Sequence, residues 1–109
     1  MKKLMISLLL AVLACTATAQ KTTQGAARRP VQFTVLQWNI WQEGTLIPGG
    51  FEAIVNELAN LQPDFVTLSE VRNYDDVDFT NKLCKALKEK GLTYYSFRSK
   101  DSGLLSKHP

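Results

Sequence analysis

Two kinds of hydrophobic pattern alternate along the chain from residue 31 onward. Tracts dense in β-branched, aromatic and other apolar residues predict strands, and they occupy residues 31–38, 65–71, 93–98 and a stretch that begins at Gly103. Tracts with apolar residues at i, i+3 and i+4 predict amphipathic helices over residues 51–61 and about 78–90. The order strand, helix, strand, helix, strand is typical of an α/β domain.

Local signals indicate where these elements end. Pro63 restricts the backbone of the residue before it, so we expect the first helix to stop there. Asp78 or Asp76 is a good N-cap for the second helix, and Gly91 is a good residue to follow its C-terminus. The first strand carries apolar side chains at both parities from Val35 onward, which predicts that other elements cover both of its faces.

Two polar side chains stand at the ends of the first two predicted strands. Strands joined by a helix usually run parallel, so the side chains of Asn39 and Glu70 should converge at one edge of the sheet. A carboxylate beside an apolar strand needs a partner or a cation. From the residues alone, an ion pair between Glu70 and Arg72, simple exposure of Glu70 and metal binding all stay open, and Asn39 could equally be a turn former.

The N-terminal segment has the three-part layout of a secretory signal peptide. Lys2 and Lys3 precede an apolar run that is too short to span a bilayer, and small residues end it at Ala19. We therefore expect residues 1–19 to be a signal peptide and residues 20–30 a flexible leader, with export to the periplasm or outside the cell. Lipidation at Cys15, as in a bacterial lipoprotein, is the alternative.

Charge and cysteine usage add little to this picture. Cleavage after Ala19 would lower the formal net charge from +3 to +1, which offers no electrostatic case for nucleic acid. It would also leave Cys84 as the only cysteine, and we expect that residue to be a small buried hydrophobe on the second helix.

Three motifs, in order, resemble those of the endonuclease/exonuclease/phosphatase (DNase I-like) superfamily. Residues 33–40 are similar to its first strand, which ends in Asn-Ile or Asn-Leu, and residues 62–71 are similar to its Pro-Asp, apolar, Gln-Glu-Val motif. Residues 101–109 resemble its Gly, two apolar residues, Ser, Arg or Lys, aromatic, Pro strand. One position departs from the pattern, because Ser69 stands where the superfamily commonly has Gln.

The resemblance implies a fold and three site residues. The fold would be the N-terminal part, residues 31–109, of a four-layered α/β sandwich in which two packed β-sheets are flanked by helices. Glu70 would bind the catalytic Mg²⁺ (or Mn²⁺), Asn39 would lie beside it as a catalytic residue, and Arg72 would bind substrate. For Arg72, a solvated ion pair with Asp75 or Asp76 is equally consistent with the sequence.

The catalytic histidines of the superfamily and their carboxylate partners lie further along the fold than these motifs. His108 occupies the often aromatic position before the final proline, so we do not expect it to be catalytic. The motifs therefore predict the N-terminal part of a secreted bacterial enzyme that hydrolyses phosphomonoesters or phosphodiesters. Its substrate would be a sugar or inositol phosphate, a phospholipid headgroup or nucleic acid, with no stable protein partner and no transmembrane segment. The alternative is a small exported α/β binding domain without catalysis, in which no cation binds.

Overall fold

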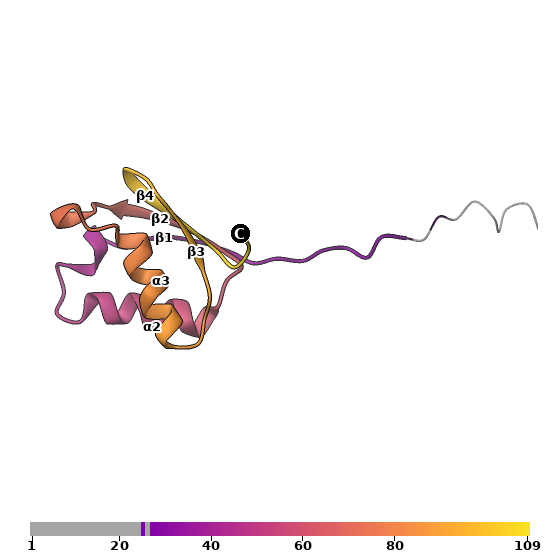
Figure 1. Cartoon of the computed structure of the whole chain (residues 1–109), viewed down its shortest axis with the longest axis horizontal. Coiled ribbons are helices and arrows are strands. Elements are labelled where there is room, and N and C mark those ends of the chain that lie inside the picture. Colours follow the sequence, from indigo (N-terminus) through magenta and orange to yellow (C-terminus); the bar gives the residue numbers. More distant parts are fainter. Residues whose placement is uncertain (1–24, 26) are drawn as a thin grey trace, which may run out of the picture. The chain divides into compact units, whose positions relative to one another are not determined.

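The computed structural model describes Gly25 and residues 27–109, and Gln32–Pro109 form one compact unit within it (Figure 1). The predicted signal peptide, Cys15 and most of the predicted leader lie outside the described residues. Within the leader, Gly25 and residues 27–30 are exposed and have no helix or strand. None of the helices that the structure describes has the length and apolar character needed to cross a membrane.

One mixed sheet and two helices make up the compact unit, which confirms the α/β class. The strands are β1 (Val35–Asn39), β2 (Phe65–Val71), β3 (Tyr95–Arg98) and β4 (Asp101–Ser106), in the spatial order β1-β2-β4-β3. β1 and β2 are parallel neighbours, as predicted, and β4 is antiparallel to both β2 and β3. The helices α2 (Gly50–Leu61) and α3 (Phe79–Glu89) lie on the same side of the sheet (Figure 1).

The helix α2 begins one residue before the predicted start and ends where predicted. Its buried face consists of Ile54, Val55 and Leu58. Gln62, the residue before Pro63, has a φ of 46°, so the chain leaves the helical region there. Leu61, which the periodicity placed on the same face, is exposed at the end of the helix.

Both ends of α3 are capped as the sequence predicted. Asp78 is the N-cap, and its Oδ1 accepts a hydrogen bond of 3.1 Å from the backbone N–H of Asn81. At the other end Gly91 has a φ of +80°, and the backbone N–H of Leu92 donates to the Leu87 carbonyl at 3.0 Å. This is a Schellman motif, in which only glycine adopts the left-handed position without strain.

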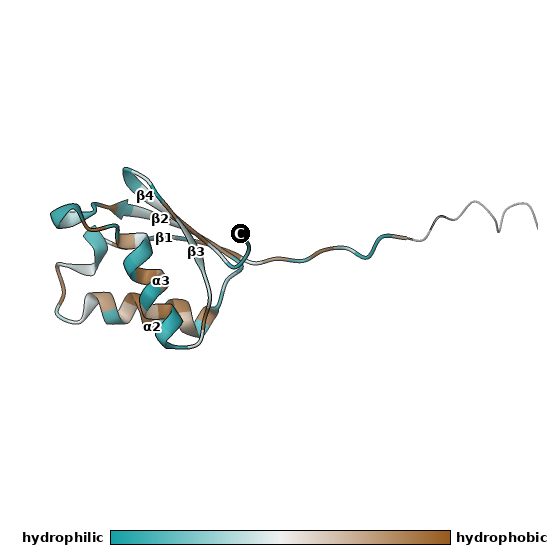
Figure 2. Cartoon of the chain, viewed as in Figure 1, coloured by the Kyte–Doolittle hydropathy of each residue, from teal (hydrophilic) through white to brown (hydrophobic). Residues whose placement is uncertain are grey.

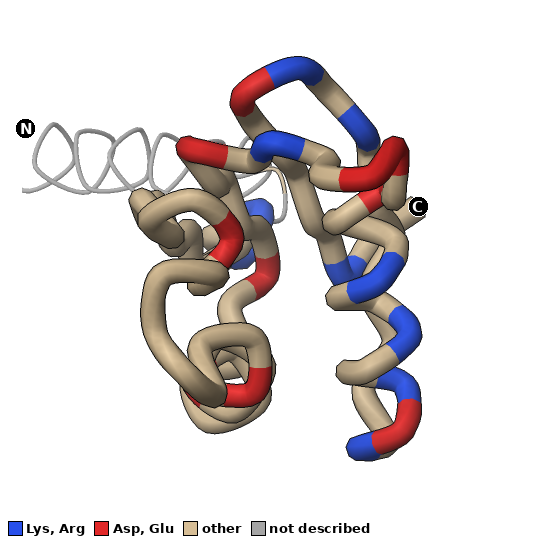
Figure 3. The backbone as a smooth tube through the Cα atoms, turned by 90° about the vertical axis from the view of Figure 1, so that its left-hand side faces the viewer, with Lys and Arg blue, Asp and Glu red and all other residues tan. Residues whose placement is uncertain are grey.

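α3 is amphipathic, with hydrophobic and polar residues alternating along it (Figure 2). Its basic residues recur along the length of the helix (Figure 3). Phe79, Leu83 and Leu87 are buried against the sheet, whereas the lysines are exposed. Cys84 packs against the core, as expected, but it is only partly buried. Burial raises the pKa of its thiol, although a hydrogen bond with Ser96 acts in the opposite direction.

The two faces of the sheet differ. One face packs on the helices and carries the buried side chains of Val66, Leu68 and Leu105. No described helix or strand packs on the other face, and it exposes large apolar side chains: Val35, Tyr95, Phe97 and Leu104. Of the two faces of β1 that we expect to be covered, the described residues cover the one that packs on the helices and leave the other exposed. We call this uncovered surface the open face.

The carboxylate of Asp64 joins the start of β2 to the residue before β1. Its Oδ2 accepts hydrogen bonds from the backbone N–H of Thr34 at 2.7 Å and from the Thr34 hydroxyl at 3.1 Å. The backbone hydrogen bond from Thr34 is the main reason why the pKa of Asp64 is lowered from 3.8.

This shift predicts a pH dependence of stability. Because the folded-state pKa of Asp64 is lowered, its contribution is present above pH 3.8 and is lost as the pH falls through the folded-state pKa. We expect Asp64→Asn to lower the free energy of unfolding of the complete protein at pH 7, and the difference from wild type to shrink below pH 3.8. Urea unfolding over a pH series measures this, with the exposed Glu57→Gln on α2 as control. Parallel curves for Asp64→Asn and wild type would contradict it.

Candidate functional site

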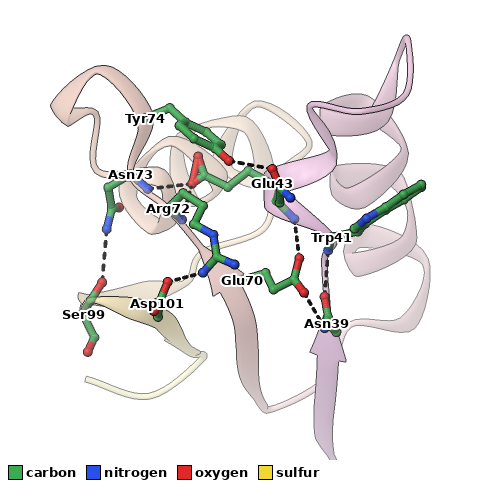
Figure 4. A network of polar contacts seen from close by, with 10 residues as sticks. Asn39, Trp41, Glu43, Glu70, Arg72, Asn73, Tyr74, Ser99 and Asp101 are labelled. Carbon is green, nitrogen blue, oxygen red and sulfur yellow. Dashed lines mark hydrogen bonds and ion pairs between the residues drawn. The ribbon is translucent and has the colours of Figure 1, made fainter.

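Asn39 and Glu70 meet at the edge of the sheet where β1 and β2 both end. Asn39 pairs with Ser69 in the parallel register, which places Glu70 one residue further along. The Nδ2 of Asn39 donates a hydrogen bond of 3.2 Å to Oε1 of Glu70 (Figure 4). The predicted convergence of these two side chains is confirmed, whereas their roles in catalysis and metal binding stay predictions.

The backbone of Glu70 is irregular. The pairing of β2 with β4 shifts between Ser69 and Val71, so Glu70 is the extra residue of a β-bulge. Its φ is 61°, a left-handed conformation that costs a non-glycine residue of the order of 1–3 kcal/mol. Such strain persists only where the surroundings hold it, and bulges of this kind re-aim a side chain. Here the bulge directs the carboxylate toward the end of β1 (Figure 4).

The loop after β1 supplies further contacts to this pair. The backbone N–H of Gln42 donates to Oε2 of Glu70 at 3.0 Å, so both carboxylate oxygens accept a hydrogen bond. Oδ1 of Asn39 accepts from the backbone N–H of Trp41 at 2.9 Å, which fixes the orientation of the amide. The ring of Trp41 points away from the network (Figure 4). The amide and the carboxylate are therefore held in one defined arrangement.

Glu43 belongs to the same network and was not among the predicted site residues. Only 6% of it is exposed, and its Oε2 accepts hydrogen bonds from the backbone N–H groups of Arg72 at 3.0 Å and Asn73 at 2.8 Å. It lies in a loop with no hydrophobic period. Nothing in the local sequence distinguishes it from an exposed loop acid.

Arg72 pairs with a residue that the sequence did not suggest. Its guanidinium forms a salt bridge with Asp101, not with Glu70, Asp75 or Asp76. The reason is the hairpin of β3 and β4, which places Asp101 opposite Val71 in the antiparallel register. The expected alternative, an ion pair with Asp75 or Asp76, is therefore wrong. Asp76 instead accepts a hydrogen bond of 2.6 Å from Arg98.

A hollow of about 560 Å³ lies beside Arg72. The residues that line it are Arg72, Asn73, Asp76, Arg98, Ser99 and Lys100. Two of these residues are hydrogen-bonded to each other, because the side chain of Asn73 donates to the Ser99 carbonyl at 3.1 Å. Two of its three cations are paired with carboxylates, Arg72 with Asp101 and Arg98 with Asp76, so the third cation, Lys100, gives the hollow its excess positive charge.

His108 lies at the opposite end of β2 from Glu70. Its Nε2 is 3.9 Å from Oδ1 of Asp64, and its ring centroid is 5.7 Å from that of Phe65. Phe65 begins β2 and Glu70 comes near its end. The histidine therefore lies away from the edge where Asn39 and Glu70 meet.

The donor set at this edge suits a hard cation only in part. Among the described residues, no three His, Cys, Asp or Glu side chains come together as a metal cluster. Mg²⁺ keeps several waters and is usually bound by one or two carboxylates together with phosphate oxygens. The carboxylate of Glu70, which is partly exposed beside the Asn39 amide, provides one such ligand. The described residues therefore fit one protein ligand of a magnesium site.

The chain resembles a solved structure over part of its length. No family model and no curated protein sequence matches the chain. Among solved structures the chain is similar to a crystal structure of humanized D. rerio TDP2 with 14 mutations, at 22% sequence identity and a TM-score of 0.44. The similarity covers 69% of this chain and 30% of the other, so the chain spans less than a third of the length of that protein. A similarity of this extent does not establish the family.

Proposed function

We propose that the chain is the N-terminal part of a secreted, metal-dependent phosphoester hydrolase of the endonuclease/exonuclease/phosphatase type. The proposal rests on the three sequence motifs and on one structural observation, the contact of 3.2 Å between Asn39 and Glu70. Two polar residues that lie 31 positions apart meet at the carboxyl ends of parallel strands. In open α/β sheets, ligands bind at this edge.

Glu70 is the proposed metal ligand. Its carboxylate would hold Mg²⁺ (or Mn²⁺), which would neutralise charge developing on a phosphoryl group. Asn39 donates to one oxygen of Glu70, and the Gln42 N–H donates to the other. These two hydrogen bonds orient the carboxylate, as the partners of metal ligands commonly do.

Arg72 is the proposed substrate-binding residue. Its salt bridge with Asp101 holds the guanidinium at the rim of the hollow that Lys100 also lines. A guanidinium has five N–H donors in a planar fork, so donors remain for a phosphate after it has paired with one carboxylate oxygen. The hollow supports a phosphate-bearing substrate without distinguishing a sugar or inositol phosphate, a phospholipid headgroup or nucleic acid.

The proposed organisation is a signal peptide at 1–19, a leader at 20–30 and the start of the hydrolase domain at 31–109. The four-layered sandwich belongs to the same proposal. The described sheet and its two helices would form two adjacent layers of it, and the open face would pack against a second sheet.

Replacing the proposed metal ligand should abolish cation binding. Glu70→Gln keeps the size of the side chain and an acceptor oxygen but removes the negative charge, so we expect Mg²⁺ and Mn²⁺ binding by the full-length protein to disappear. Isothermal titration calorimetry measures this. Glu52→Gln is the matched control, because Glu52 is an exposed glutamate in the first turn of α2 and should leave binding unchanged.

Two outcomes would contradict the proposal. Binding of the cation by Glu70→Gln with wild-type affinity would exclude Glu70 as the ligand. A full-length wild-type protein that binds neither cation would favour the alternative, a small exported binding domain without catalysis.

A further inference from the structure

We propose that Glu43 is a positioning residue that holds Glu70 in its bulged conformation and thereby sets the cation affinity of the site. The inference rests on the proposed function in so far as Glu70 is taken as the metal ligand. It concerns a residue outside the three sequence motifs and outside the direct contacts of Glu70.

The first argument is the burial of Glu43. A carboxylate that is only 6% exposed costs several kcal/mol unless it is hydrogen-bonded or paired. None of the described side chains forms a salt bridge with it. The cost of burying it is offset by the backbone N–H groups of Arg72 and Asn73, which both donate to the same carboxylate oxygen. These hydrogen bonds connect the loop that contains Glu43 to the backbone at Arg72 and Asn73.

The second argument is that Glu43 binds the backbone directly after Glu70. Arg72 and Asn73 come two and three residues after Glu70, so the bonds to Glu43 fix the path of the chain directly after the bulge. The residue before Glu43, Gln42, donates its own backbone N–H to the side chain of Glu70. One short loop therefore holds Glu70 both at its carboxylate and at the backbone that follows it (Figure 4).

The third argument is the rigidity of that loop. Gly44 follows Glu43, and its N–H donates to the Ile40 carbonyl at 2.9 Å. Gly44 also packs so closely on Gly50, the first residue of α2, that a Cβ on Gly50 would lie 2.0 Å from the Gly44 carbonyl oxygen. The loop is thus anchored on a helix. It can hold Glu70 in a left-handed conformation that an isolated strand would not keep.

The length of the side chain and its charge can be separated experimentally. Glu43→Gln keeps the length and an oxygen that accepts from both N–H groups, but it loses the charge. Glu43→Asp keeps the charge, but it is one methylene too short to reach both N–H groups. A positioning role predicts that the glutamine variant binds the cation better than the aspartate variant. A role through charge alone predicts the reverse.

The test is the affinity for Mn²⁺ in the full-length protein, measured by titration below the melting temperature of each variant. We expect Glu43→Ala and Glu43→Asp to weaken binding by about 10–100-fold, the usual effect of removing a partner that orients a metal ligand. Glu43→Gln should stay within a few-fold of wild type. Glu52→Ala, which removes an exposed glutamate from α2, should have no effect.

The outcomes separate this inference from the proposed function. If the wild type binds Mn²⁺ and folded Glu43→Asp binds equally well, the positioning role is excluded and the proposed function stands. Weaker binding by Glu43→Gln than by Glu43→Asp would also overturn the inference. If the wild type binds no cation, the proposed function fails, and the positioning role fails with it. Should Glu43→Ala not fold, the comparison of the glutamine and aspartate variants decides the question.

Discussion

Residues 20–109 produced by themselves will associate into oligomers or aggregates, and charges placed on the open face will reduce that association. The exposed fraction of the residue is 66% for Phe97, 61% for Phe33 and 58% for Val35. Covering a large apolar side chain contributes about 1.5–3 kcal/mol. Several of them on one face therefore rival the 5–15 kcal/mol by which a whole domain is typically stable.

The edges of the sheet add to this tendency. β1 and β3 are its two outer strands in the described part of the chain, and an unpaired strand edge is a template for pairing with another chain. We therefore expect this segment to show no sharp thermal transition as a monomer and no divalent-dependent phosphodiesterase activity.

A double substitution tests whether the apolar side chains of the open face cause the association. Phe97 and Leu104 are cross-strand partners, so Phe97→Glu with Leu104→Lys replaces two apolar side chains by a facing pair of opposite charges. Size-exclusion chromatography with light scattering should show a shift toward smaller species. Leu61→Lys, which removes an exposed leucine at the end of α2, should not produce it. A wild-type segment that is already a monomer with a sharp transition would contradict the prediction and favour the small binding domain.

Gly103→Ala will destabilise the protein, because the contact between β4 and α3 leaves no room for a Cβ. A Cβ on Gly103 would lie 2.4 Å from Cγ2 of Thr80 and 3.3 Å from Cγ2 of Val71. Thr80 is fully buried, and its hydroxyl donates to Oδ1 of the N-cap Asp78 at 2.9 Å, so the helix cannot easily yield. Overpacking of this kind typically costs about 1–3 kcal/mol.

A second substitution should restore much of that stability. Thr80→Ser removes the Cγ2 methyl group while it keeps the hydroxyl, so we expect the double variant Gly103→Ala, Thr80→Ser to be more stable than Gly103→Ala alone. Urea unfolding of the complete protein measures the coupling free energy. Ser102→Ala is the control, since Ser102 is exposed on the open face. Additive effects of the two substitutions would show that steric overlap is not the cause.

Local signals were sufficient for the two helices and for β2, but the other strands begin elsewhere than predicted. β1 begins at Val35 and not at residue 31, β3 at Tyr95 and not at residue 93, and β4 at Asp101 and not at Gly103. The predicted strand over residues 65–71 matches β2, and both helices begin and end within about one residue of their predicted limits. Proline geometry, an N-cap and a left-handed glycine act between residues close in sequence, so the sequence expresses them directly. The convergence of Asn39 and Glu70 also followed, because a strand-helix-strand unit makes its two strands parallel.

The tertiary structure decided the features that depend on non-local pairing. β4 lies between β2 and β3, and this order sets Asp101 against Val71 and so gives Arg72 its partner. The bulge at Glu70 arises from the same pairing. No local pattern encodes a register between segments about 30 residues apart.

The sequence by itself determined the α/β class, the limits of the helices and the edge where Asn39 and Glu70 meet. Only the tertiary structure decided how that edge is held: which carboxylate is buried, which oxygen accepts which N–H, and which face of the sheet is uncovered. The burial of Glu43 shows why, since its two partners follow it by 29 and 30 residues. Whether a loop acid is solvated or buried depends on the backbone that packs over it, and that backbone comes from another part of the chain.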